Sequence, residues 1–119
     1  MRRSIAALLY LAAPVAAAAG EADVVAVKAT LAGDGTWRFD VTVEHADTGW
    51  DHYADAWEVL APDGAVLGTR TLLHPHENEQ PFTRSLAGVA VPDGITEVIV
   101  RAHDSVHGYG EGLTVALPR

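Results

Sequence analysis

The stretch from Trp37 to His45 constrains the fold more than any other part of this sequence. Its residues alternate strictly: one phase reads Trp, Phe, Val, Val, His, and the other reads Arg, Asp, Thr, Glu. A period of two is typical of a β-strand that turns one face to a core and the other to water. The residues that follow form a polar loop that contains Asp47, Trp50, Asp51, His52 and Tyr53. The sequence therefore predicts a core strand that leads directly into a candidate functional loop.

The first 19 residues have the composition of an export signal. Arg2 and Arg3 precede an apolar run over residues 5–15, and small residues follow up to Gly20. This order predicts a signal peptide over residues 1–19 that is cleaved after Ala19, give or take two residues. A transmembrane anchor is the alternative, but the run is shorter than the roughly 20 residues that span a bilayer. We therefore expect a single exported domain over residues 20–119, periplasmic or secreted, with no membrane span after cleavage.

Charge and cysteine content exclude several classes of protein. The chain has 8 basic and 16 acidic residues, and removal of Arg2 and Arg3 with the signal leaves a formal charge of −10. Such an acidic domain is not expected to bind nucleic acid or anionic membranes, which require basic patches. The absence of cysteine from the sequence excludes disulfides, thiolate metal ligands and cysteine nucleophiles. Stability must then come from apolar burial, with a bound ion as one further source.

The remainder of the chain reads as short strands separated by turns, without a sustained helical period. Pro-Asp-Gly occurs at residues 62–64 and again at 92–94, and Gly-Asp-Gly occurs at 33–35; these are turn sequences. About seven strands in 100 residues predict an all-β fold, an antiparallel β-sandwich like immunoglobulin or fibronectin type III domains but without a disulfide. A small closed barrel is the alternative. The strands are expected at residues 24–31, 37–45, 53–61, 66–73, 82–89, 95–103 and 113–117.

The histidines all fall at one end of this predicted sandwich. If successive strands run up and down, the loops after the second, fourth and sixth strands lie at the same end, where variable immunoglobulin domains carry their binding loops. Imidazole binds zinc, copper, nickel and iron, and nearby carboxylates can complete such a site or orient the rings. The acidic residues expected at this end are Asp47, Asp51, Glu77, Glu79 and Asp104. With no cysteine and Met1 as the only methionine, zinc or copper(II) is the expected ion. The candidate metal ligands are His45, His52, His74, His76, His103 and His107.

Structural roles are open for the same residues. His45 has the phase of a buried residue, His103 could be an ordinary strand residue paired with Asp104, and residues 74–76 could form a stiff polyproline-like connector. The six rings could also join the loops by hydrogen bonds without metal. A protein or glycan partner is a further alternative, because aromatic and acidic residues share this end. The candidate partner-binding residues are Trp50, Asp51, Tyr53, Asp104 and Tyr109.

Three segments carry a resemblance to known proteins. They read DTGWDHYADAWEV, LLHPHENEQPFTRS and VRAHDSVHGYG, and they resemble a family of small exported bacterial immunoglobulin-like proteins of uncharacterised function. The resemblance implies a small exported sandwich and no particular chemistry. Three functions remain open: metal binding, a metal-free interaction module, and a small metalloenzyme that uses an open coordination position. The first is the prediction that the residues favour.

Overall fold

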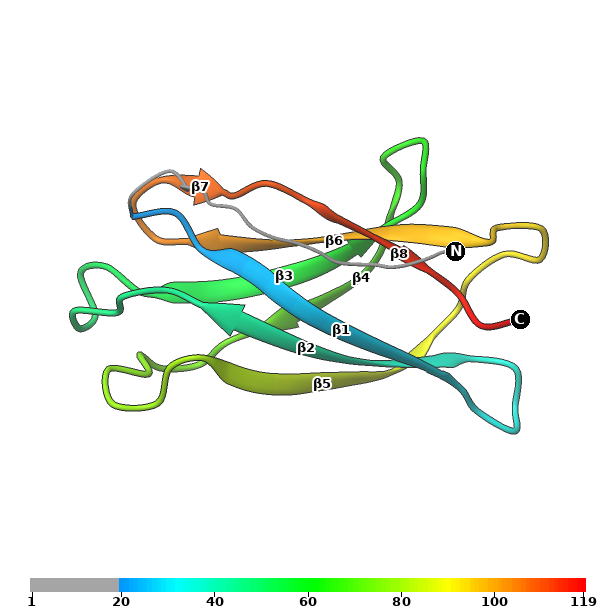
Figure 1. The fold of residues 1–119 in the computed structure, drawn as a ribbon, viewed down its shortest axis with the longest axis horizontal. Helices are drawn as coiled ribbons and strands as arrows, with labels where there is room; N and C mark the ends of the chain where they lie inside the picture. The colour runs from blue at the N-terminus through cyan, green and yellow to red at the C-terminus, as the bar shows by residue number, and fades with distance from the viewer. Residues whose placement is uncertain (1–19) are drawn as a thin grey trace.

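The structure, a computed structural model, describes residues 20–119, and the predicted signal peptide lies outside these residues. Two antiparallel sheets form the fold, which is shown in Figure 1. The three-stranded sheet has the order β1-β2-β5, with β1 (Asp23–Leu31), β2 (Trp37–Glu44) and β5 (Phe82–Val89). The five-stranded sheet has the order β4-β3-β6, with β7 and β8 both paired to β6. Its strands are β3 (Ala54–Leu60), β4 (Val66–Thr71), β6 (Glu97–Asp104), β7 (Gly108–Tyr109) and β8 (Leu113–Ala116).

This architecture confirms the predicted all-β antiparallel sandwich. In the constant-type immunoglobulin arrangement, the first, second, fifth and fourth strands share one sheet. Here β4 pairs with β3 instead, in the sheet that contains β6. The described residues include one strand more than predicted, because Gly108 and Tyr109 pair with Asp104 and His103 where the sequence suggested a flexible glycine loop. No helix within residues 20–119 is long and apolar enough to cross a membrane.

The core lies between the two sheets and follows the alternation of β2 and β6. Side chains of Trp37 and Phe39 from β2 are almost fully buried, and Trp57 of β3 is fully buried. In β6 the inward phase is Val98, Val100 and Ala102, each without exposed surface. These apolar side chains provide most of the burial that stabilises the sandwich.

The direction of the strands places the functional loops together. Figure 1 shows the loops after β2, β4 and β6 at one end, which is on the left, and the short turns after β1, β3 and β5 at the other. The first described residues also reach the left-hand end, beside the loop between β6 and β7. We call this end the loop end.

Candidate metal centre

His45 is held at the loop end by a buried carboxylate. It continues the inward phase of β2, and only 3% of its surface is exposed. Its Nδ1 lies 2.6 Å from Oδ1 of Asp47. An ionised carboxylate only accepts hydrogen bonds, so Nδ1 is the protonated nitrogen and donates. This contact leaves Nε2 as the ring nitrogen that is available to a metal.

Asp47 is fixed by the backbone around it. Its Oδ1 also accepts a hydrogen bond from the amide of Ala54 at 3.0 Å, and its Oδ2 accepts one from the amide of His76 at 2.7 Å. The side chain has no exposed surface. Asp47 thus joins the loop after β2 to β3 and to the loop after β4, and it orients the His45 ring from behind.

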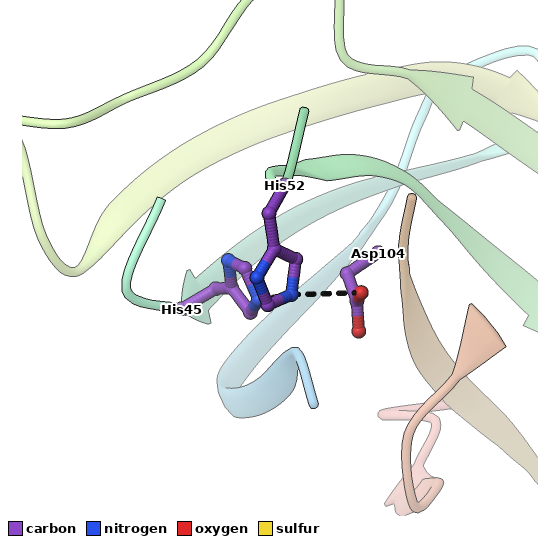
Figure 2. A group of neighbouring side chains, drawn as sticks. All are labelled: His45, His52 and Asp104. Atoms are coloured by element: carbon purple, nitrogen blue, oxygen red, sulfur yellow. Dashed lines mark hydrogen bonds and ion pairs between the residues drawn. The ribbon is translucent and has the colours of Figure 1, made fainter. Parts of the chain in front are cut away.

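Two side chains from other elements converge beside His45 Nε2. His52 comes from the loop before β3 and Asp104 from the end of β6 (Figure 2). The Nε2 atoms of His45 and His52 are 3.2 Å apart, and His52 Nε2 is 3.1 Å from Asp104 Oδ1. One ligand atom from each of His45, His52 and Asp104 lies within 4.8 Å of the others. The three residues therefore have the spacing of a metal-ligand set.

The carbonyl oxygen of Gly20 completes the group. It lies 2.8 Å from His45 Nε2 and 3.3 Å from His52 Nε2. A carbonyl oxygen only accepts hydrogen bonds, so a protonated nitrogen of either ring, or one cation between these atoms, would satisfy it.

Asp104 is a buried carboxylate, and one of its two oxygens has no hydrogen-bond partner among the described residues. Oδ1 accepts hydrogen bonds from the amides of Val106 and His107, at 2.9 and 2.8 Å, and lies 3.2 Å from His107 Nδ1. Burial would raise the pKa of Asp104, but these hydrogen bonds outweigh it and hold the pKa below its ordinary value. The side chain is fully buried, and Oδ2 has no hydrogen-bond partner among the described residues. An unpaired anionic oxygen in this position is costly unless a cation lies near it.

The distances fit a small divalent ion. Ligand atoms about 2.0–2.1 Å from a tetrahedral zinc ion are roughly 3.3 Å from one another. Four separations are near this value, at 2.8 to 3.3 Å: those of His45 Nε2 from Gly20 O and from His52 Nε2, and those of His52 Nε2 from Gly20 O and from Asp104 Oδ1. Two imidazole nitrogens with carboxylate and carbonyl oxygens suit zinc or copper(II).

His107 is the third histidine of this cluster. Its ring centroid is 5.0 Å from that of His52, and it lies against Asp104. His107 therefore lies close enough to orient Asp104.

His74 and His76 form a second pair, away from the cluster. Their ring centroids are 4.7 Å apart, and the buried His76 ring stacks on Phe82 at 3.9 Å. Neither ring nitrogen of His76 has a hydrogen-bond partner among the described residues. Burial, together with the nearby charge of Arg84, lowers the pKa of His76. The neutral His76 thus packs as an aromatic ring, and its backbone amide holds Asp47.

His103 and Tyr109 belong to a third group, on the outer face of the five-stranded sheet. His103 Nδ1 lies 2.5 Å from Asp55 Oδ1, and the Tyr109 hydroxyl donates to Glu58 at 3.2 Å. The Arg101 guanidinium lies 3.9 Å from the centre of the Tyr109 ring and also pairs with Glu58. This network leaves His103 and Tyr109 remote from the ligand set formed by His45, His52 and Asp104.

The other predicted partner-binding residues lie in the loop after β2. Trp50 is 67% exposed and meets Tyr53 edge to face, with ring centroids 5.6 Å apart. Asp51 is exposed, and its carbonyl oxygen lies 3.4 Å from Ser105 Oγ. This loop therefore presents an open aromatic surface close to His52.

Sequence reasoning placed Asp47 and Asp104 among the carboxylates near the histidines, with Asp104 also a candidate for partner binding, but it did not identify Gly20 as part of the candidate centre. The signal for Asp104 was present, because it continues the inward phase of Val98, Val100 and Ala102. The same alternation turns His103 outward with Arg101. The position of Gly20 has no comparable signal in its local pattern.

The fold and the cluster together define a small all-β protein with a buried His/Asp group at its loop end. Among curated proteins it is similar to a putative lipoprotein of Halomicrobium mukohataei, with 50% identity over 90 residues. The match covers 76% of this chain and 44% of that protein, so the chain spans less than half of its relative's length. No family model matches the chain, and no solved structure matches it.

Proposed function

We propose that this protein is an exported metal-binding protein that holds zinc or copper(II) at its loop end. His45, His52 and Asp104 are the side-chain ligands, and the Gly20 carbonyl oxygen is a further ligand. The observation that carries the proposal is the convergence of His45 Nε2, His52 Nε2 and the Gly20 oxygen within 2.8 to 3.3 Å. The role of such a centre is metal handling or a metal-dependent interaction.

Two further features support this proposal. Asp47 fixes the tautomer of His45 from behind, as carboxylates do for histidine ligands in many metal sites. The formal charge of −8 for the whole chain favours the approach of cations over anions. Export is supported by the predicted signal and by the relative's description as a putative lipoprotein.

A metal-free interaction module is the second candidate. The exposed Trp50 and its contact with Tyr53 favour it, because aromatic side chains at a loop end bind sugars and peptides well. This candidate predicts that the protein is isolated without stoichiometric metal and that its melting temperature does not respond to EDTA.

The test compares His52→Ala with His103→Ala in the untagged protein. The two histidines are matched, because their side chains are 24% and 31% exposed and each lies within about 3 Å of a carboxylate. Zinc and copper(II) are titrated by calorimetry with a competing chelator, and circular dichroism verifies that both variants fold. We expect one ion per chain in the parent and in His103→Ala, and binding at least 100-fold weaker in His52→Ala.

Equal binding by both variants would show that the metal lies elsewhere and would overturn the assignment. A parent protein that binds neither ion tighter than the millimolar range would remove the metal-binding function and favour the interaction module.

A further inference from the structure

Gly20 occupies a position that favours glycine. Its φ is +91°, a conformation that other residues rarely adopt. A Cβ atom added here would lie 2.6 Å from Cε1 of His107, so the His107 ring would have to move. Gly20 thus lies against His107, with its carbonyl oxygen directed at His45 and His52.

The residues that follow hold Gly20 in this position. Ala22 is fully buried, and a Cβ added to Gly110 would lie 2.2 Å from the Ala22 carbonyl oxygen. Gly110 is itself fixed, because its amide donates to the Ala102 carbonyl at 2.9 Å. The residues just before β1 therefore pack closely against the segment that follows β7. This packing fixes Gly20 at the loop end.

Gly20 is also the residue that the sequence predicts as the first of the mature chain. Cleavage after Ala19 would give it a free α-amino group. This nitrogen and the carbonyl oxygen of the same residue can close a five-membered chelate ring on one ion. Amines, like imidazoles, are nitrogen ligands that suit zinc and copper(II). An α-amino group has a pKa of about 7.7–8.0, so an ion can displace its proton close to neutral pH.

We propose that removal of the signal peptide completes the metal centre, with the Gly20 α-amino nitrogen as a ligand beside His45, His52 and Asp104. This inference rests on the proposed metal-binding function. In the precursor the same nitrogen belongs to a peptide bond, which is a poor ligand at neutral pH. The precursor therefore holds the ion weakly, and the processed chain holds it tightly. Tight metal loading follows export and does not precede it.

The test uses three forms of the protein that differ only at the amino terminus. The first begins at Gly20, the second retains Ala19 before it, and the third begins at Gly20 with an acetylated α-amino group. Zinc and copper(II) affinities are measured with a competing chelator, and protons released on binding are counted by titration in buffers of different ionisation enthalpy. For copper(II), a ¹⁵N label at Gly20 reports nitrogen coordination through the electron paramagnetic resonance spectrum.

We expect the Ala19-containing and acetylated forms to bind at least 10-fold more weakly than the form that begins at Gly20. That form should also release more protons per ion, and the label at Gly20 should change its spectrum. Equal affinities for the three forms, with binding still lost in His52→Ala, would refute the role of the amino terminus and leave the metal site intact. A metal affinity that is the same in all three forms and in His52→Ala would refute the site as well. Amino-terminal sequencing of the exported protein must find Gly20 first, and any other start overturns the inference.

Discussion

The substitution Asp47→Asn tests whether the carboxylate behind His45 supports both the fold and the proposed metal centre. The buried Asp47 accepts hydrogen bonds from His45 Nδ1 and from the amides of Ala54 and His76. Asparagine keeps one acceptor oxygen but replaces the other with an NH2 group, which can only donate. At least one buried donor then faces another donor.

The size of the effect follows from these contacts. A hydrogen bond to a charged group contributes about 1.5–3 kcal/mol, and leaving a buried donor unpaired costs about 1–3 kcal/mol. We therefore expect Asp47→Asn to lower the free energy of unfolding by about 3 kcal/mol. For a domain of this size each kcal/mol lowers the melting temperature by about 4–8 °C, so the expected decrease is about 15 °C. Metal affinity should fall by about 10- to 100-fold, because the orientation of His45 is lost.

Asp55→Asn is the matched control. Asp55 also pairs with a histidine, at 2.5 Å from His103 Nδ1, but its side chain is 28% exposed. A pair open to water contributes about 0–1 kcal/mol, and this one lies outside the cluster. Unfolding in urea is followed by the fluorescence of the buried Trp37 and Trp57. Equal losses of stability in the two variants, or an unchanged metal affinity in Asp47→Asn, would refute the reasoning.

Two further predictions concern His76 and Gly20. Burial lowers the pKa of His76 in the folded protein. Below about pH 6.5 the unfolded chain therefore binds more protons than the folded one. The free energy of unfolding then decreases as the pH falls from that value towards the folded pKa. His76→Phe should weaken this pH dependence and raise stability at pH 5.5, with metal affinity unchanged; a steeper pH profile in urea unfolding would contradict this role. Gly20→Ala should displace the His107 ring, because a Cβ would lie 2.6 Å from its Cε1. We expect a metal affinity at least 10-fold weaker, with the cooperative unfolding transition kept. An affinity equal to that of the parent in calorimetry would contradict a role for the close contact between Gly20 and His107.

The residues of β2 and β6 show how much of the fold the sequence determined. Alternation alone identified the buried face of the strand that begins at Trp37 and leads to His45, and the same alternation sets the inward phase of β6 at Val98, Val100 and Ala102. Side chains on a strand alternate between faces whatever their neighbours are, so this information is local. The turn sequences with proline and glycine then gave the reversals, and the reversals gave the common end at which the histidine-bearing loops lie.

Only the tertiary structure decided which side chains at that end meet. A register shift between Ala54 and Ala56 breaks the alternation of β3, so Asp55 faces His103 instead of sharing the buried phase of Trp57. Sequence reasoning grouped six histidines, and the structure separates them into the cluster of His45, His52 and His107, the pair His74 and His76, and the outward His103. The approach of Gly20 to His45 joins residues 25 positions apart through the packing of the chain against Gly110. Such contacts depend on strand register and close packing, which no local pattern in the sequence specifies.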